Sequence, residues 1–267
     1  MSGSSNLAAF GSVAAVPARQ TGGVTDEFRI GRRFQGPTGS GQGGWTAHRF
    51  EASVGRPLQV SIRAPIPLET DLAVARESWD EAAWRLGLPD GGSAGPPIMT
   101  GRPRGLLDVD TSPVSIDAAA AARRTFGQLV GDHPVPGCFS CGLLDDSMCV
   151  HAAPLGDGTD RYATDWTVPS WALAVGGVDE GVLWAALDCA AAWYVCRSRE
   201  RRTAFTVQFA VDVLAALEVG ETYALVAWSG GADDDWDGRK RCAGSVAFDR
   251  EGKCVARSTS FWVSVEE

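Results

Sequence analysis

The chain has 267 residues, of which 45% are hydrophobic and ten are tryptophan, so it can bury a core as one large domain or as two of about 130 residues each. Its formal net charge of −9 argues against nucleic acid and anionic membrane surfaces as partners. No run approaches the roughly 20 apolar residues of a membrane-spanning helix, and an odd number of cysteines favours reduced thiols and a cytoplasmic protein.

The first half predicts strands around one short helix, after an N-terminal flexible tail of small residues at 1–26. A glycine loop at 36–44 leads into that helix. Residues 89–116 are rich in glycine and proline and predict a connector that runs over the surface. We expect strands at 27–34, 57–66, 71–79 and 81–88, with the last two paired, and helices at 45–55 and at 115–130, where Ser115 is the N-cap.

The second half follows the same order, with a strand and then a helix before several more strands. The helix at 179–198 is apolar on almost every side, so it must be buried all round. In the last strand, alternate residues from Val255 to Val265 share one mostly apolar face. We expect strands at 161–168, 204–214, 222–230, 239–249 and 254–265, with a hairpin turn at 250–253.

The two halves repeat one arrangement. PLQVSIRAPIPLETDLAV and AFTVQFAVDVLAALEVGETYALV occupy equivalent places roughly 147 residues apart. A curved sheet around each helix would bury it, which predicts an α+β fold of two antiparallel sheets, each wrapped around a central helix. Residues 1–130 carry 13 basic and 12 acidic side chains, whereas residues 131–267 carry 11 and 21. We therefore expect a degenerate first repeat with its connector at 27–132 and a second repeat, carrying the site, at 133–267.

One carboxylate, Asp188, interrupts the apolar helix in GVLWAALDCAAAWYV, residues 181–195. Its neighbours three and four residues away are one tryptophan and three alanines, so no basic partner shares its face. A buried, unpaired carboxylate costs several kcal/mol, so it either raises its pKa or serves a purpose. Three interpretations stay open: a surface face of the helix, a carboxyl satisfied by distant backbone groups, and a catalytic carboxylate.

Several segments resemble the thioesterase-like hotdog superfamily, most closely a tandem-repeat, actinobacterial-type acyl-CoA thioesterase-like group. In the first half the resemblance rests on QGGWTAHRF and VSIRAPIPLETDL. In the second half it rests on HPVPGCFSCG, ATDWTVP, the Asp188 helix, GRK and DREGKCVARSTSFWVSV. The chain departs from the family at the start of the helix, where GGVDEG replaces the familiar His-Gly-Gly.

The resemblance implies a tandem double hotdog that mimics a two-chain dimer and could itself form a homodimer, with acyl-CoA or acyl-carrier thioesters as substrates. In many members a carboxylate on the central helix activates water against the thioester carbonyl, and Asp188 stands at that position. Backbone N–H groups near Gly181 and Val182 would polarise the carbonyl. Trp184 and Trp193 complete the substrate-binding residues expected on the helix. No cofactor and no metal is expected.

The sequence offers two basic residues that could bind substrate and two alternatives to hydrolysis. Arg239 and Lys240 could contact the phosphates of coenzyme A, although a solvated hairpin end after the acidic run at 233–237 explains them equally well. Hydrolysis of an acyl thioester is the favoured function. The alternatives are a non-catalytic acyl-thioester-binding protein, in which Asp188 tunes the pocket, and a hotdog hydratase or dehydratase, which normally needs a histidine paired with the aspartate.

The cysteines allow a second kind of site. Cys138 and Cys141 form C-x-x-C, and Cys149 and His151 follow closely, so the four could hold zinc. No second C-x-x-C accompanies them. A packed thiol pair at a turn is therefore the favoured interpretation.

Two patterns in the first half are weaker. The glycines at 39, 41 and 44 match G-x-G-x-x-G, but no strand–helix–strand unit follows, so a flexible loop is favoured over a dinucleotide site. If Gly44 is aligned with Gly181, Glu51 falls opposite Asp188. That position is either a solvent-facing glutamate, which is favoured, or a second carboxylate site.

Overall fold

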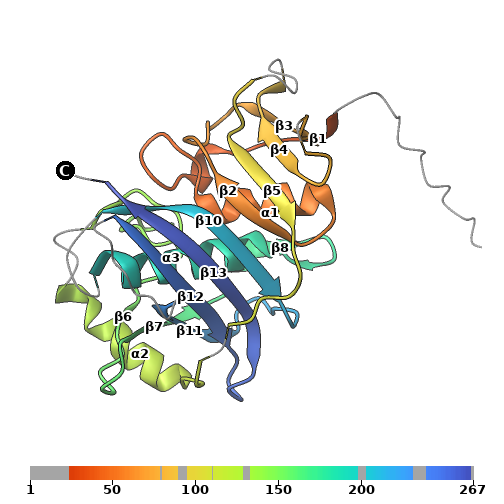
Figure 1. The fold of residues 1–267 in the computed structure, drawn as a ribbon. Helices are drawn as coiled ribbons and strands as arrows, with labels where there is room; N and C mark the ends of the chain where they lie inside the picture. Colours follow the sequence, from red (N-terminus) through yellow and green to blue (C-terminus); the bar gives the residue numbers. More distant parts are fainter. Residues whose placement is uncertain are drawn as a thin grey trace, which may run out of the picture.

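The computed structural model describes residues 24–78, 80–89, 95–109, 111–128, 133–197, 203–230 and 239–265. Their strands form one antiparallel sheet of 11 strands, beside a two-stranded ribbon, and three α-helices pack on the sheet (Figure 1). A large antiparallel sheet with few helices confirms the α+β class.

The first part of the sheet has the strand order β1-β3-β4-β5-β2. Strands β3 and β4 pair, as the sequence predicts. Residues expected to continue the first strand form a short 3-10 helix instead, at Arg32–Phe34. The elements are β1 (Val24–Arg29), α1 (Gly43–Val54), β2 (Leu58–Ile62), β3 (Asp71–Arg76), β4 (Trp84–Gly87) and β5 (Met99–Pro103).

The second part continues the sheet in the order β10-β13-β12-β11-β7-β6. Here the predicted strands and the observed strands agree to within one or two residues. The elements are α2 (Ile116–Arg124), β6 (Ala153–Pro154), β7 (Arg161–Thr167), β8 (Leu173–Ala174), β9 (Gly177–Val178), α3 (Gly181–Arg197), β10 (Ala204–Val213), β11 (Thr222–Ser229), β12 (Lys240–Phe248) and β13 (Cys254–Ser264).

Helix α3 is buried all round, as its composition requires. All but two of its 17 residues are buried. One side packs against β7 and β10–β13, and the other side packs against α1 and the segment 133–150. The Ser140 hydroxyl donates to the Ala185 carbonyl at 3.0 Å, and the Trp193 indole N–H donates to the Val150 carbonyl at 2.8 Å. Across the described ranges, no helix is both long and apolar enough to cross a membrane.

Helix α2 covers the opposite face of the sheet. The Ser115 side chain accepts a hydrogen bond from the Ala118 N–H and caps the helix, as predicted, but the α-helix ends at Arg124 rather than at residue 130. Ala119 and Ala122 pack with β7, β11 and β12 in a second, smaller core. The predicted first repeat, 27–132, therefore includes a helix, α2, that packs on strands of the second repeat.

The two parts of the sheet join where β2 pairs with β10, with Ser61 opposite Gln208 and Val60 opposite Phe209. Beneath this junction α1 and α3 cross closely. A Cβ atom on Gly44 would lie 2.5 Å from the Trp184 carbonyl oxygen, so only glycine permits the crossing. The strands of both halves thus form one continuous sheet rather than two separate bodies.

The predicted surface connector at 89–116 is wrong in part, because it contains β5. Met99 is completely buried, and β5 pairs with both β2 and β4. Glycine and proline made this segment look like a loop. In the structure a Cβ atom on Gly101 would lie 2.7 Å from the Leu58 side chain and 3.0 Å from Phe50, so the glycine makes room for the core.

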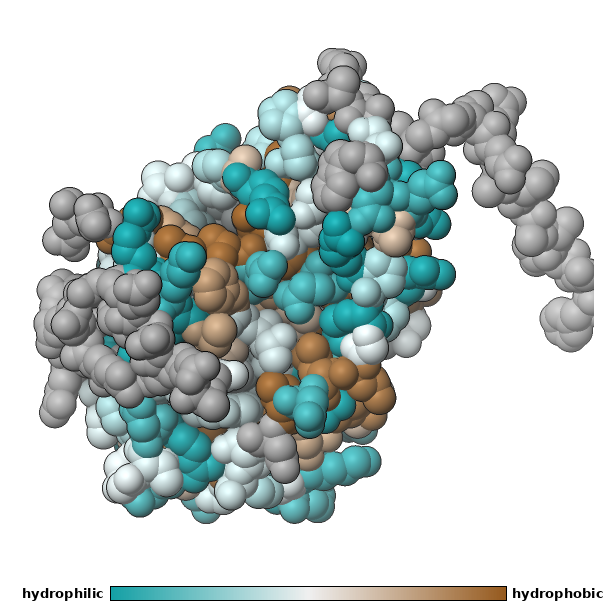
Figure 2. All heavy atoms as spheres, in the orientation of Figure 1, coloured by the Kyte–Doolittle hydropathy of each residue, from teal (hydrophilic) through white to brown (hydrophobic). Residues whose placement is uncertain are grey.

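The more apolar face of the last strand is not the one that faces the core. From Ala256 to Ser264 the alternate residues that are buried are Ala256, Ser258, Ser260, Trp262 and Ser264. The more apolar residues Phe261 and Val263 are half-buried on the other face of the strand. Figure 2 shows hydrophobic residues interspersed among hydrophilic ones on the surface seen in this view. Small side chains face α3 because the helix lies close, and the Ser245 hydroxyl, which donates to the Leu187 carbonyl, is 2.5 Å from that of Ser258.

Candidate active site at the crossing of α1 and α3

A cavity of about 410 Å³ lies where the two helices cross. Its walls are mostly apolar, and Arg63 and Pro65 on its rim are exposed. A cavity of this size with a few convergent polar groups is the usual form of a small-molecule site. Its walls come from the loop 36–43, residues 62–66 at the end of β2 and beyond it, the segment 133–141, the α3 residues Asp188, Cys189, Ala192, Trp193 and Cys196, residues 204–207 of β10 and Trp262.

Asp188 faces this cavity and is only 4% exposed. Its Oδ2 accepts hydrogen bonds from the Gln42 Nε2 at 2.6 Å and from the Gly44 N–H at 3.2 Å. Its Oδ1 accepts a hydrogen bond from the Thr206 hydroxyl at 2.6 Å. The carboxylate that lacks a partner on its own helix therefore finds three donors on α1 and β10, and the surface interpretation is wrong.

The N-terminus of α1 points at this carboxylate. Gln42 caps the helix: its side-chain oxygen accepts from the Trp45 N–H at 2.6 Å while its amide nitrogen donates to Asp188. Gly43 lines the cavity, and its N–H has no hydrogen-bond partner within the described part of the chain. A helix N-terminus with unpaired N–H groups carries partial positive charge and stabilises an anion in front of it.

The pKa of Asp188 is raised to about 6 because burial disfavours the charged carboxylate. Hydrogen bonds from Thr206, Gly44 and Gln42 act in the opposite direction, and burial outweighs them. The result is a carboxylate that holds a proton more tightly than an ordinary aspartate, in a dry and largely apolar pocket. Such a group suits proton transfer near neutral pH.

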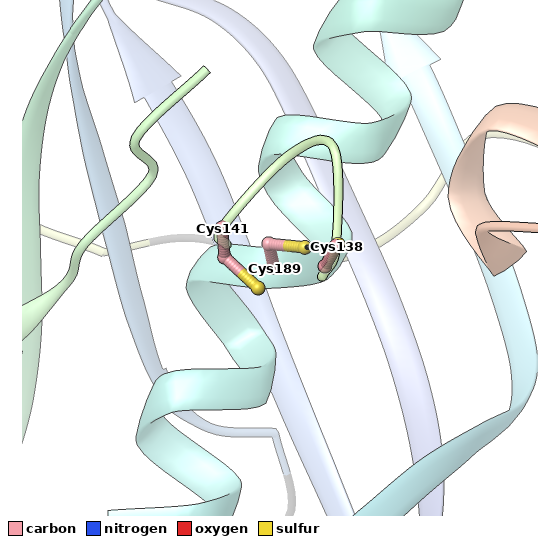
Figure 3. Close-up of side chains that lie close together, drawn as sticks. All are labelled: Cys138, Cys141 and Cys189. Atoms are coloured by element: carbon pink, nitrogen blue, oxygen red, sulfur yellow. Dashed lines mark hydrogen bonds between the residues drawn. The ribbon is translucent and has the colours of Figure 1, made fainter. Parts of the chain in front are cut away.

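Three buried thiols lie close together (Figure 3), and one of them belongs to the residue that follows Asp188. Cys138 and Cys141 come from the loop before β6, and Cys189 follows Asp188 on α3. Hydrogen bonds from the Cys141 and Cys189 thiols, with smaller contributions from the Ser140 and Cys141 N–H groups, hold the pKa of Cys138 well below its usual range. The structure thus adds a third cysteine to the pair that the sequence shows.

The predicted carbonyl-polarising groups lie elsewhere. The Gly181 N–H donates to the Asp179 carboxylate and the Val182 N–H to the Asp179 carbonyl, and neither residue lines the cavity. The partner for Asp188 is instead the N-terminus of the other helix, because α1 and α3 cross. The sequence signal for it is Gln42-Gly43-Gly44, which forms the cap and the first two residues of that helix.

The remaining predicted binding residues are divided between the cavity and other places. Trp193 lines the cavity, whereas Trp184 is buried against the rings of Phe209 and His48 and does not reach it. Arg239 and Lys240 are exposed and do not line the cavity. The basic side chain on the rim is Arg63. It lies in the segment VSIRAPIPLETDL, but the sequence did not indicate it as a binding residue.

Thr206 and His133 are further cavity residues that sequence reasoning missed. Thr206 looks like an ordinary strand residue, and only the pairing of β10 in the sheet brings its hydroxyl to Asp188. His133 lines the cavity, but its Nδ1 accepts from the Val135 N–H and its Nε2 lies 2.6 Å from the Cys141 carbonyl oxygen. Both of its ring nitrogens are thus engaged by the loop.

Comparison with known proteins gives likeness in structure only. No protein family profile matches the chain, and no curated protein matches it. The structure is similar to the E. coli PaaI protein from the phenylacetic acid degradation operon, with 19% identity over 40% of this chain and 74% of that chain and a TM-score of 0.34. Zebra fish thioesterase superfamily member 2 shares 12% identity over 57% of this chain and 99% of that chain, with a TM-score of 0.40.

A Streptococcus mutans protein bound to acetyl CoA shares 14% identity over 41% of this chain and 84% of that chain, with a TM-score of 0.35. Likenesses at these TM-scores carry no argument about what this chain does. Its function has to follow from its own cavity and side chains.

Proposed function

We propose that the protein is a tandem double hotdog that hydrolyses an acyl thioester, with coenzyme A or an acyl carrier as the thiol and Asp188 as the general base. The observation that carries this proposal is the geometry of one cavity. A buried carboxylate, an apolar wall and the helix residue Gly43, whose N–H has no partner among the residues that the structure describes, all line the same space. These are the parts that acyl transfer to water needs.

In the proposed reaction, the Asp188 carboxylate takes a proton from water as the water oxygen attacks the thioester carbonyl carbon. Negative charge then develops on the carbonyl oxygen, and the Gly43 N–H at the α1 N-terminus would stabilise it. The C–S bond breaks next. The thiolate leaves with the proton held by Asp188, so the carboxylate is restored and a carboxylic acid and a thiol are released.

The walls of the cavity suggest how the substrate would lie. Ala192, Trp193 and Trp262 offer an apolar surface for the acyl group. Arg63 is exposed on the rim, and its Nε donates to Thr100 at 3.4 Å, which leaves the rest of the guanidinium for a phosphate of the thiol-bearing part. We therefore expect the thiol-bearing part to leave past Arg63.

Binding without catalysis is the second candidate, and one observation favours it. Asp188 already accepts three hydrogen bonds, which occupy three of the roughly four lone pairs of a carboxylate. In this reading Asp188 holds the helix crossing together, and the cavity retains an acyl thioester intact. Hydrolysis remains the proposal because the Gly43 N–H and the cavity lie beside the carboxylate.

The two candidates differ in what Asp188→Asn does. We expect wild-type protein to release thiol from at least one member of a panel of acyl-CoAs, and Asp188→Asn to lower the turnover by roughly 10²–10⁴-fold, the usual worth of a positioned acid–base group. The asparagine keeps an oxygen for the two N–H donors, while the Thr206 hydroxyl can accept instead of donating. Asp165→Asn, on β7 outside the cavity lining, is the matched control.

Thiol release should be measured with a colorimetric thiol reagent, and acyl-CoA affinity by calorimetry on the same preparations. Tight binding without thiol release by the wild-type protein would replace hydrolysis with the binding function. Undiminished turnover of Asp188→Asn on a substrate that the wild-type protein cleaves would remove Asp188 from the mechanism.

A further inference from the structure

The three thiols beside Asp188 form a compact cluster. The sulfur atoms of Cys138, Cys141 and Cys189 all lie within 4.8 Å of one another, and those of Cys138 and Cys189 are 3.8 Å apart. Figure 3 shows the loop that carries Cys138 and Cys141 lying over α3 at Cys189. All seven cysteines lie in the described part of the chain, and none forms a disulfide.

We propose that Cys138, Cys141 and Cys189 bind one thiophilic metal ion, with Zn²⁺ as the reference case, and leave its fourth coordination position open toward the cavity. Sulfur atoms around a tetrahedral zinc ion with Zn–S bonds of about 2.3 Å lie about 3.8 Å apart. The Cys138–Cys189 separation has this value, and the other two separations are no more than 4.8 Å. All three residues line the cavity, so the position opposite them faces it.

The loop is built to hold its two sulfurs in place. The Gly142 N–H donates to the Cys138 carbonyl at 2.7 Å, and the Leu143 N–H donates to the Pro136 carbonyl at 2.9 Å. A Cβ atom on Gly142 would lie 2.2 Å from the Cys138 carbonyl oxygen, so the tight turn after the second cysteine requires glycine. The Ser140 hydroxyl ties the same loop to the Ala185 carbonyl of α3.

Thiolate ligands also need hydrogen-bond donors around them, because three thiolates and one divalent ion leave a net negative charge in the core. The Gln42 amide nitrogen lies 3.7 Å from the Cys189 sulfur. Gln42 also donates to Asp188, so one side chain links the proposed metal site to the carboxylate.

The four-residue zinc set that the sequence spacing allows is not assembled. Cys149 lies against Ser147, and the ring of His151 faces the carbonyl oxygens of Cys141 and Gly142. Cys189, which lies 48 residues after Cys141 in the chain, takes the place of both in the cluster. Among the described residues, no fourth His, Cys, Asp or Glu completes the ligand set.

The test is metal binding by the full chain, which needs no substrate. Reduced protein stripped with a chelator is titrated with Co²⁺ and then with Zn²⁺. We expect one Co²⁺ per chain with thiolate-to-cobalt charge-transfer absorption and tetrahedral d–d bands, displacement by Zn²⁺, and a melting temperature that rises with either ion. Cys138→Ser, Cys141→Ser and Cys189→Ser should each weaken Zn²⁺ affinity by at least 100-fold.

Cys149→Ser and Cys196→Ser are the controls. Cys149 belongs to the four-residue zinc set that the sequence spacing allows but the structure does not assemble, and Cys196 lines the same cavity outside the cluster. Both should bind like the wild-type protein. Thermal melts of each apo variant show whether it is folded. Absence of charge-transfer absorption in folded, reduced protein would overturn the proposal, as would a Cys149→Ser effect equal to that of Cys189→Ser. A Cys138–Cys189 disulfide in protein purified without oxidant would also overturn it.

Discussion

Helices α1 and α3 meet at two points, which we call the two crossings, and these differ: the start of α1 lies against Asp188 of α3, and the start of α3 lies against Trp45 and Arg49 of α1. Asp188 lies seven residues after Gly181 on α3 and contacts the N-terminus of α1. Glu51 lies seven residues after Gly44 on α1, is half-buried, and its Oε2 accepts a hydrogen bond from the Leu58 N–H at 2.7 Å. Aligning the two glycines makes Glu51 the counterpart of Asp188 in the sequence, although the favoured expectation for Glu51 is a position facing solvent.

The first crossing leaves a cavity, and the second is filled. At the start of α3 the Asp179 side chain caps Gly181 and pairs with Arg49, and the Trp45 ring packs on Gly181. Phe34 stacks on Trp45 with ring centroids 3.9 Å apart. The same backbone arrangement therefore supports a site only where a neutral glutamine, rather than a paired aspartate, caps the opposing helix. The proposed activity belongs to one crossing, and the other serves stability.

The largest expected difference between the crossings concerns their glycines. Gly44→Ala should destabilise the protein by about 3 kcal/mol and abolish turnover, because its Cβ would lie 2.5 Å from the backbone oxygen of Trp184 and 2.9 Å from the Asp188 Cβ. Gly181→Ala should cost less, about 1 kcal/mol, and retain turnover, because its Cβ would meet side-chain atoms of Trp45 at 2.8 Å rather than the backbone of the other helix. Urea unfolding and thiol release measure the two effects.

Gly105→Ala is the reference for these substitutions, because no atom lies within 4 Å of the added Cβ position. Equal losses of stability for Gly44→Ala and Gly181→Ala would show that the two crossings are packed alike.

A smaller effect is expected from the hydroxyl that holds Asp188. Thr206→Val keeps the shape of the side chain but removes the donor 2.6 Å from Asp188 Oδ1. A hydrogen bond to a charged group is worth about 1.5–3 kcal/mol, so kcat should fall about tenfold or more while KM changes little. Thr206→Ser, which retains the hydroxyl, should recover most of the rate. A Thr206→Val enzyme with unchanged kcat would mean that the hydroxyl does not position the base.

The smallest effect concerns the closed crossing and its pH dependence. Burial raises the pKa of Glu51 to about 7, against the opposing Leu58 N–H and Arg104, while Asp212 and Glu180 raise it further. The folded protein therefore binds this proton more tightly than the unfolded chain, and the stabilisation is lost as the pH rises from about 4.5 to about 7. Glu51→Gln should remove this loss and stabilise the protein by about 1 kcal/mol at pH 8 after allowance for solvent screening.

Urea unfolding at pH 5 and at pH 8 tests this prediction, with the exposed Glu27→Gln as control. Glu51→Gln should leave thiol release unchanged. A large loss of turnover in that variant would show that the second crossing takes part in function.

Much of the local structure can be predicted from the sequence. The strands β10–β13 and the helix α3 follow from alternation and from an unbroken apolar helix, because these periodicities report burial directly. The strand β5 and the buried face of β13 do not follow from these patterns. At both places the deciding factor is the close approach of a helix, which favours Gly101 and the buried serines over the larger apolar residues that a hydrophobic pattern selects.

The sequence by itself determined the α+β class, the burial of α3 and the isolation of Asp188 among alanines and tryptophans. Only the tertiary structure decided what meets that carboxylate: Gln42 and Gly44 are 146 and 144 residues away in the chain, and Thr206 is 18 residues away on a strand. The same holds for Cys189, 51 residues from Cys138. Periodicity and capping are properties of neighbouring residues, whereas these contacts exist only because two distant helices cross beneath one sheet.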